Sequence, residues 1–375
     1  MRLIYADNAA TTKMDPDAFE AMKPFLMENY GNASQPYFFA DPAKKAISGA
    51  RRTIAECIGA EPEEIFFTSG GTESDNWAIK ETAFSATEKR LSITSQIEHH
   101  AVLNSCAAIE RLGYPVSYLP VSEEGVVHPE NLNHCITDNT GLVSVMLANN
   151  EIGTIEPVAE LAEIAHAHGA LFHTDAVQAV GHIPIDVKKL GVDMLSSSAH
   201  KFNGMKGSGF LYIRKGTKIH PYADGGSQEH RMRAGTENVA AIVSMAVALK
   251  KNCDHLEENT QKLLKLEKLF LDALTAAGID YIRNGSDSHL PGNISISIRG
   301  ASGEMLLHRL DLKGVCISTG SACDSVNTRV SHVIEAIHVP EEYAKGTIRI
   351  SLGKDNTEDE ASEIASILCK ILTKR

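Results

Sequence analysis

Short β-rich runs alternate with helical stretches through the first two-thirds of the chain. We expect strands, in chain order, at 64–69, 91–95, 116–119, 142–148, 170–174, 193–197 and 209–213. Helices are expected between some of these runs, at 73–83, 102–112 and 158–168. This alternation predicts an α/β fold with a mainly parallel sheet that carries helices on both faces. Because ligands of such sheets bind at the carboxyl ends of the strands, functional residues are expected at those ends.

The pattern changes after about Lys251. Apolar residues recur at helical spacing from Leu256 to Leu274, which predicts one long amphipathic helix. It is followed by an expected strand, helix, strand and helix at 293–298, 303–312, 347–352 and 358–372. A chain of 375 residues exceeds the size at which one core usually stops growing, so we expect two domains. The large domain would span 13–255, and a smaller α+β domain would combine 1–12 with 256–375.

Charge and composition argue against several classes of protein. The formal net charge of −12 disfavours direct binding of nucleic acid or of an anionic membrane. No apolar run is long enough to span a bilayer, and the first residues lack a signal peptide's apolar core, so we expect a cytoplasmic protein. The seven cysteines form no CxxC pair and the sixteen histidines no HExxH motif. We therefore expect neither a disulfide framework nor a metal site.

Lys201 and Asp175 stand at two of the expected strand ends. Pyridoxal 5'-phosphate needs a lysine that forms a Schiff base with its aldehyde and a carboxylate that pairs with its pyridinium nitrogen. Lys201 follows Ser198 and His200, and Asp175 is followed by Gln178, which could donate to the ring hydroxyl. Taken singly, the lysine could be a solvated surface charge and the aspartate a helix cap. Together they predict a pyridoxal phosphate site.

A glycine-containing turn could bind the phosphate. The segment 68–76 follows a strand and opens a helix, and it contains Gly71 and Thr72. Backbone N–H groups and the helix dipole favour an anion there, and Ser198 and His200 would add donors. The alternative is an ordinary capped turn between strand and helix. The segment is not a Walker loop, because no GK[ST] sequence follows.

His99 and Arg349 are further candidates. His99 follows another strand end, where an imidazole could stack on the cofactor and move protons because its pKa lies near the operating pH. A histidine at a helix N-terminus is an equally good interpretation. Arg349 lies within an expected strand and could clamp a substrate carboxylate with two hydrogen bonds. A structural salt bridge is the alternative.

Cys323 differs from the other cysteines in its surroundings. Small and polar residues flank it from Ile317 to Thr328, which predicts an exposed, mobile loop. The other six cysteines lie mostly in apolar or helical contexts and are interpreted as inert packing residues. An exposed thiol is chemically reactive, so Cys323 is a candidate nucleophile, and a nearby cation or helix N-terminus would favour its thiolate.

Taken together, these motifs resemble those of the pyridoxal-phosphate-dependent cysteine desulfurases of the NifS/IscS type. The resemblance runs nearly end to end, through segments 5–12, 67–76, 149–153, 175–178, 200–201, 233–238 and 320–323. It implies the architecture of fold-type-I pyridoxal phosphate enzymes and a homodimer. Departures from the usual pattern at Met205, His338 and 224–231 remove no catalytic group.

The resemblance also implies a role for each matching residue. Lys201 would hold the cofactor, Asp175 would pair with its ring nitrogen, and His99 would lie over the ring. Gln178 and Asn150 would contact the ring hydroxyl side, and Arg349, with Asn150 beside it, would bind the substrate carboxylate. The implied phosphate ligands are Gly71, Thr72, Ser198 and His200, with Thr236 reaching the phosphate of the neighbouring subunit. Cys323 would accept the sulfur.

The implied reaction converts L-cysteine to L-alanine and leaves sulfur on Cys323 as a persulfide. A sulfur-acceptor protein of an iron–sulfur cluster, thio-cofactor or tRNA-thiolation pathway would then take the sulfur. Fold does not fix function, so three alternatives stay open. The first is a selenocysteine lyase. The second is an aminotransferase or β-lyase that does not use Cys323, and the third is a scaffold without activity, against which Lys201, Asp175 and His99 argue.

Overall fold

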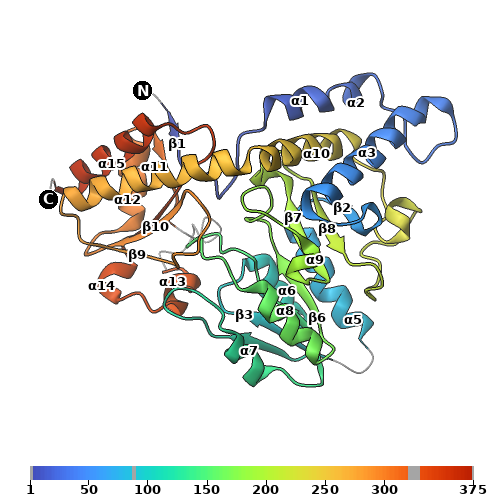
Figure 1. The fold of residues 1–375 in the computed structure, drawn as a ribbon, viewed down its shortest axis with the longest axis horizontal. Helices are drawn as coiled ribbons and strands as arrows, with labels where there is room; N and C mark the ends of the chain where they lie inside the picture. Colours follow the sequence, from blue (N-terminus) through green and yellow to red (C-terminus); the bar gives the residue numbers. More distant parts are fainter. Residues whose placement is uncertain (1–2, 87–89, 320–329, 374–375) are drawn as a thin grey trace.

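A seven-stranded sheet forms the centre of the larger part of the molecule (Figure 1). The computed structural model describes residues 3–86, 90–319 and 330–373. The strand order is β2-β8-β7-β6-β5-β3-β4, and β8 alone runs antiparallel to its neighbours. The bounds are β2 Ile65–Thr68, β3 Leu91–Ser95, β4 Val116–Leu119, β5 Thr140–Ser144, β6 Leu171–Asp175, β7 Met194–Ser198 and β8 Gly209–Ile213. The expected mainly parallel α/β sheet is confirmed.

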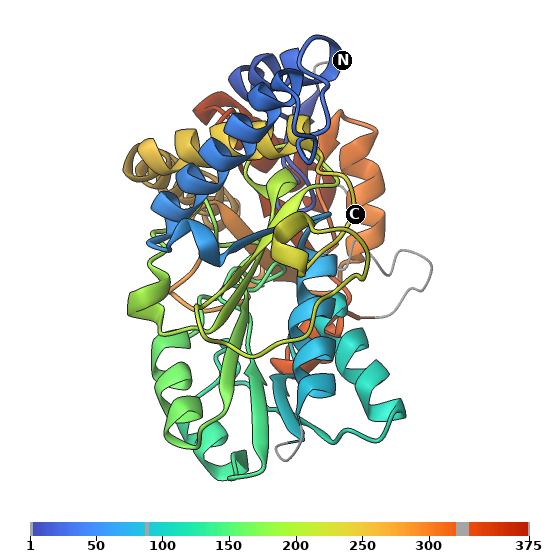
Figure 2. The same cartoon turned by 90° about the vertical axis from the view of Figure 1, so that its right-hand side faces the viewer.

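Both faces of this sheet are covered by helices (Figure 2). Successive residues of β7, Met194 and Leu195, belong to different apolar clusters, because neighbouring side chains of a strand point to opposite faces. One cluster includes residues of α3 Asp41–Ile58, α8 Val158–Ala167 and α10 Val239–Asp254. The other includes residues of α6 His100–Arg111 and of the helical run that α4 Gly71–Asn76 opens. Because both faces are covered, almost every residue of the inner strands β6 and β7 is buried, whichever face it points to.

The last third of the chain builds a second apolar core. Its antiparallel sheet has the order β12-β10-β9, with β9 Tyr281–Arg283, β10 Asn293–Ile298 and β12 Thr347–Ser351. The covering helices are α11 Leu256–Ala276, α12 Gly303–Asp311 and α15 Glu358–Thr373. The N-terminal strand β1 Ile4–Tyr5 pairs with β11 Val315–Cys316, and Ile4 and Ala6 pack into this core. The first residues of the chain are therefore held by its last third.

The remaining elements are short. They are α1 Pro16–Met22, α2 Pro24–Met27, η1 Phe38–Ala40, η2 Pro62–Glu64, η3 Trp77–Glu81, α5 Thr82–Ser85, α7 Pro129–Cys135, α9 Val187–Leu190, η4 Ala199–Lys201, η5 Gln228–Arg231, α13 His332–Ala336 and α14 Glu341–Ala344. The helix expected at 73–83 is a run of α4, the π-helical η3 and α5. The strand expected at 142–148 is wrong beyond Ser144, where β5 ends.

The long helix α11 follows the apolar periodicity that predicted it. It buries Leu263, Leu266, Phe270 and Leu274 on one side and exposes charged residues on the other. This amphipathic pattern is typical of a helix that covers a core on one side and faces water on the other. Within the described part of the chain, no helix combines the length and apolar character needed to cross a bilayer.

Replacing Phe270 with alanine should destabilise the second core. Phe270 is 0% exposed, whereas Leu264 on the same helix is 43% exposed. Phe270→Ala should lower the free energy of unfolding by about 3–5 kcal/mol through lost burial and a cavity. Leu264→Ala, the matched control, should change it by about 0.5 kcal/mol or less. Urea titration followed by circular dichroism measures both, and equal losses would contradict the assignment of the buried face.

Candidate active site

The described candidate residues from the expected strand ends meet at one edge of the large sheet. Asp175 is the last residue of β6, Lys201 ends η4 just after β7, and His99 follows β3 by four residues. Thr68 ends β2, which runs in the same direction as these strands because β8 reverses between β2 and β7. Since parallel strands end at the same edge, residues far apart in sequence lie side by side here.

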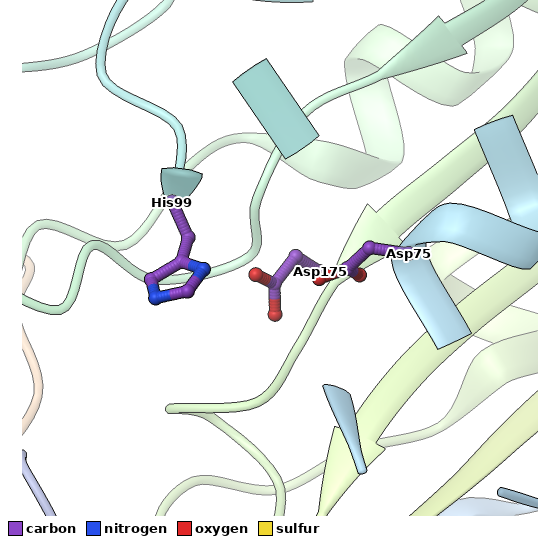
Figure 3. A group of neighbouring side chains, drawn as sticks. All are labelled: Asp75, His99 and Asp175. Carbon is purple, nitrogen blue, oxygen red and sulfur yellow. The ribbon is translucent and has the colours of Figure 1, made fainter. Parts of the chain in front are cut away.

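Asp75, His99 and Asp175 form a compact cluster (Figure 3). One nitrogen or oxygen atom from each lies within 4.8 Å of the other two. Asp175 Oδ1 also accepts a hydrogen bond from Val177 N at 2.9 Å, which fixes the carboxylate. Asp75 comes from α4, behind the glycine turn, and is fully buried. The cluster therefore joins the ends of β6 and β3 to the helix that starts after β2.

This cluster places two carboxyl groups out of contact with water. Burial raises the pKa of Asp175, and the neighbouring His99 and Lys201 oppose that rise. The pKa of Asp75 is held well above its ordinary value, first by burial and then by the charge of Asp175. Two buried carboxyl groups this close do not both ionise unless a cation compensates their charge. The pair therefore suits a cationic N–H group placed against Asp175.

His99 is the N-cap of α6. Its Nδ1 accepts a hydrogen bond from Ala101 N at 3.1 Å, so the neutral ring carries its proton on Nε2. Burial lowers the pKa of His99, and Asp175 only partly offsets this effect. The pKa therefore falls below the ordinary histidine value that the sequence interpretation assumed. His99 is therefore a residue at a helix N-terminus, as one interpretation of the sequence had it. Its ring also points toward the two aspartates, where the other interpretation would place a cofactor.

The N-terminal segment covers the lysine. Lys201 Nζ donates to the carbonyl oxygens of Ala9 at 2.5 Å and Ala10 at 2.9 Å. Gln178 Nε2 donates to the same Ala9 carbonyl at 2.9 Å. His182 Nε2 donates to the Lys201 carbonyl at 2.9 Å, which holds the lysine backbone from the other side. Lys201 is thus a partly buried lysine in a fixed position, and not a freely solvated one.

The glycine turn approaches the end of β7 closely. Gly70 has φ +144°, and a Cβ there would lie 3.3 Å from Ser198 Oγ. A Cβ on Gly71 would lie 2.5 Å from a methyl group of Val177, so only glycine fits. The turn and Ser198 are therefore adjacent, as a shared phosphate site requires. His200 instead bonds Thr11 Oγ1 through Nδ1 at 3.1 Å, and burial lowers its pKa to about 4.

Arg349 is buried and already paired. Its Nη2 donates to Asp7 Oδ1 at 2.8 Å, and its Nη1 donates to the Asn150 carbonyl at 2.8 Å. The structural salt bridge that the sequence left open is therefore present. A guanidinium has five N–H donors, so three remain. One of them, Nε, is buried and has no hydrogen-bond partner among the described residues.

Cys323 lies outside the described residues, and its surroundings are known only from the chain on either side. Before the segment, the backbone of Ser318 exchanges two hydrogen bonds with Arg349, at 2.7 and 3.1 Å. After it, Ser331 caps α13, and His332 Nε2 donates to the Glu98 carbonyl at 3.1 Å. Both ends of the segment 320–329 are therefore fixed to residues of the site or their direct neighbours.

Thr236 lies on an exposed loop before α10. The nearby Arg233 joins this loop to α4 through a hydrogen-bonded ion pair with Glu73, at 2.9 Å. Glu73 also accepts from Ser69 Oγ at 2.5 Å, beside the glycine turn. The loop that carries Thr236 is thus held against the phosphate turn, while Thr236 itself faces outward.

Sequence reasoning missed three residues that support the site. His173 is fully buried, with Ser144 Oγ and Ser196 Oγ each 2.9 Å from a ring nitrogen, and burial lowers its pKa to about 3. His173 and Asp175 share one face of β6, so the alternation of the strand could have indicated it. Asp75 and Asp7 had no such local signal, because their partners lie far away in sequence.

The described residues fit pyridoxal phosphate. Asp175 is buried beside a second carboxyl group, Lys201 is fixed nearby, and a tight glycine turn adjoins Ser198. A protonated pyridine nitrogen against Asp175 would relieve the cost of the two buried carboxyl groups. The same cluster contains atoms that could bind a metal ion, and the expectation of no metal stays a prediction.

Glu98 should make stability depend on pH. Burial raises its pKa to about 8, while Oε1 accepts from Ser95 Oγ and Met146 N. Because the folded pKa exceeds the unfolded one, the wild type should lose stability as the pH rises from about 5 to about 8. Glutamine mimics the protonated carboxyl group. The free energy of unfolding of Glu98→Gln should therefore fall by roughly 3–5 kcal/mol less than that of the wild type over this pH range.

Urea unfolding at pH 5, 6, 7 and 8 measures the difference between Glu98→Gln and the wild type. Glu163→Gln, at an exposed position on α8, is the matched control and should follow the wild type at every pH. A constant difference between Glu98→Gln and the wild type across this range would contradict the buried, protonated carboxyl.

Comparison with known proteins shows the family to which the chain belongs. A family model described as aminotransferase class-V matches residues 4–364. The cysteine desulfurase IscS of Dictyoglomus turgidum is 49% identical over 375 residues, which cover 100% of this chain and 95% of the relative. A solved NifS-like protein superposes with a TM-score of 0.94 at 39% identity, covering 99% of this chain and 100% of its own. A structure described as SspA in complex with cysteine gives a TM-score of 0.84 at 34% identity, over 94% and 99%. The chain therefore belongs to the class-V aminotransferase family and, within it, to the cysteine desulfurases.

Proposed function

We propose that this cysteine desulfurase converts L-cysteine to L-alanine with pyridoxal 5'-phosphate held by Lys201, and that Cys323 takes the sulfur as a persulfide. The observation that carries the proposal is the anchoring of segment 320–329 at both ends. Ser318 pairs with Arg349 before it, and His332 contacts the Glu98 carbonyl after it. Cys323 follows Ser318 by five residues, which an extended chain spans in at most about 18 Å. A thiol there is within reach of a substrate bound at Arg349.

The cofactor proposal rests on the cluster at the sheet edge. Bound pyridoxal phosphate would supply an aldehyde for the substrate amine and a protonated ring that stabilises negative charge at the substrate Cα. Asp175 would accept a hydrogen bond from the ring nitrogen, and His99 would lie over the ring. Gln178 and Asn150 would contact the ring hydroxyl side. The phosphate would be held by Gly71, Thr72, Ser198 and His200, with Thr236 serving the neighbouring subunit.

Lys201, once released, would carry the substrate proton. Its Nζ lies 2.5 and 2.9 Å from the carbonyl oxygens of Ala9 and Ala10, which can hold the ammonium form. Arg349 and Asn150 would fix the substrate carboxylate and so orient the Cα–H bond toward the amine. Positioning of this kind lowers the barrier because the reacting atoms no longer have to find each other. His99, with its proton on Nε2, would assist proton transfer.

Sulfur transfer would then be a displacement at sulfur. The Cys323 thiolate attacks the substrate sulfur, and an S–S bond forms as the substrate Cβ–S bond breaks. The Cβ carbon takes the electron pair and a proton and leaves as L-alanine, so one thiol and one cysteine give one persulfide and one alanine. The solved relative described as SspA in complex with cysteine supports L-cysteine as the substrate.

The persulfide would pass to a separate acceptor protein. The net charge of −12 disfavours a direct encounter with tRNA, so a protein of an iron–sulfur cluster, thio-cofactor or thiolation pathway is the proposed acceptor. We propose that the transfer takes place in the cytoplasm, where reducing conditions keep thiols free. The six described cysteines are all free thiols.

We also propose a homodimer. The N-terminal part of the chain exposes a group of large apolar side chains, Leu26, Met27, Tyr30, Tyr37 and Phe38. Phe38 is 84% exposed and Met27 is 79% exposed, which is unusual for such residues unless another surface covers them. A second copy is the proposed partner, because Thr236 also faces outward and would complete the neighbouring phosphate site.

Two domains are the proposed division of this subunit. Residues 13–255 would form the large domain, and 1–12 with 256–375 the small domain that carries Cys323. The support is that Ile4 and Ala6 share an apolar cluster with α11 and the later helices, whereas the residues of α10 pack on the large sheet. The boundary would fall at His255, between α10 and α11.

Cys323→Ala should lower the rate of alanine formation from L-cysteine by at least about 100-fold, because the nucleophile is lost. The absorbance of the bound cofactor should be unchanged, since Cys323 takes no part in holding it. Cys369→Ala, at a half-buried position on α15, is the control and should keep full activity. Mass spectrometry after treatment with L-cysteine should find one added sulfur on Cys323. Undiminished turnover in Cys323→Ala would favour a β-lyase or aminotransferase instead.

Phe38→Asp should weaken the homodimer by at least about tenfold, because it places a charge in an apolar interface. Light scattering across a dilution series measures the mass of the particles. Leu312→Asp is the matched control, since Leu312 is also strongly exposed but lies at the end of α12, in the last third of the chain. A dimer equally stable in both variants would show that the apolar N-terminal surface serves another purpose.

A further inference from the structure

Two cysteines that the proposed reaction does not use, Cys57 and Cys253, pack against the apolar cluster of the large sheet. Cys57 is the second-last residue of α3, and Cys253 is the second-last residue of α10. Both side chains are half-buried, and they line the same cavity. The two helices pack against each other, so the pair lies where both end.

We propose that Cys57 and Cys253 form a redox-active dithiol, which closes to a disulfide when a hydroperoxide reaches it. The sequence interpretation treated both as inert packing residues. Nothing in the spacing of residues 57 and 253 brings them together, and only the packing of α3 on α10 does so. The two helix ends pack together and both cysteines line one cavity, so the pair meets the first requirement for a disulfide, which is proximity.

The surroundings divide the roles between the two thiols. The hydrogen bond to Cys253, and then burial, raise the pKa of Cys57, which therefore keeps its proton and donates it. The same hydrogen bond lowers the pKa of Cys253, while burial and Asp254 oppose this and Lys250 supports it. The other group facing the pair, Lys250, is itself ion-paired with Asp254. Cys253 is therefore the sulfur that reacts first, since the thiolate is the nucleophile.

The proposed chemistry balances with one hydroperoxide. The Cys253 thiolate attacks one peroxide oxygen, the O–O bond breaks, and the leaving hydroxide takes a proton to become water. Cys253 is then a sulfenic acid, and the Cys57 sulfur attacks it to form the S–S bond. The second hydroxide leaves and takes the proton of Cys57. Two thiols and one hydrogen peroxide thus give one disulfide and two waters.

A cavity beside the thiols gives the oxidant room. It has a volume of about 210 Å³, and Cys57 and Cys253 line it together with mainly apolar residues. A space of that size holds several water-sized molecules, and hydrogen peroxide is of that size. Val180 and Gly181 also line the cavity, and they precede His182, whose ring donates to the Lys201 carbonyl. The disulfide would thus join α3 to α10 behind the support of the lysine.

The test is best made in a Cys323→Ala background with bound cofactor, so that persulfide chemistry and the proposed desulfurase mechanism do not affect the result. Treatment with hydrogen peroxide, followed by blocking of free thiols and proteolysis without reductant, should yield a peptide pair joined through Cys57 and Cys253 with the mass of two hydrogens lost. Dithiothreitol should separate the two peptides. The oxidised protein should also melt a few degrees higher, because the disulfide closes a loop of roughly 200 residues.

Serine variants of single cysteines show whether the linked peptide depends on Cys57 and Cys253. Cys253→Ser and Cys57→Ser, each in the same background, should lose the linked peptide and the rise in melting temperature. Cys135→Ser, at another half-buried cysteine, should keep both. The proposal is overturned if peroxide oxidises Cys57 or Cys253 only to separate sulfinic acids, or if the linked peptide joins other cysteines. It is also overturned if both thiols stay reduced at peroxide concentrations that oxidise Cys135.

Discussion

The site depends first on the buried guanidinium of Arg349. It donates to Asp7 near the N-terminus and to the Asn150 carbonyl in the large α/β part, while its own strand belongs to the second core. Removing one partner of such a buried pair costs about 3–5 kcal/mol, because the other charge is left without compensation. Ser318, which leads into the segment containing Cys323, is bonded to the backbone of the same residue. One arginine therefore joins three separate parts of the chain around the proposed substrate.

The second constraint is electrostatic. The site contains the buried carboxyl groups of Asp75 and Asp175 and the buried, neutral ring of His173. With the imidazoles kept neutral by burial, these groups offer little positive charge to balance Asp175. A cofactor that brings its own protonated nitrogen would be bound more tightly than a neutral one of the same shape. The same burial keeps water from competing for the carboxylate.

Sequence reasoning succeeded where the signal was local. Alternating apolar runs predicted the parallel sheet, and the rule that ligands bind at carboxyl ends of strands led to Asp175 and Lys201. The helical periodicity of α11 was likewise readable. Asp75 and the ion pair of Asp7 could not be predicted, because their significance comes from contacts across hundreds of residues. Cys323 was singled out by its small and polar neighbours and stays a prediction, because it lies outside the described residues.

The N-terminal segment that covers Lys201 has a consequence for folding. Ile4 pairs with Val315, and the backbone of Ala6 accepts a hydrogen bond from Ser351, so residues 4–6 are held by the last part of the chain to be synthesised. Contacts of such long sequence separation form late, because their loop entropy is lost before they contribute. The carbonyl oxygens that Lys201 contacts are therefore in place only when the whole chain has folded. A nascent or truncated subunit would carry the lysine without its cover.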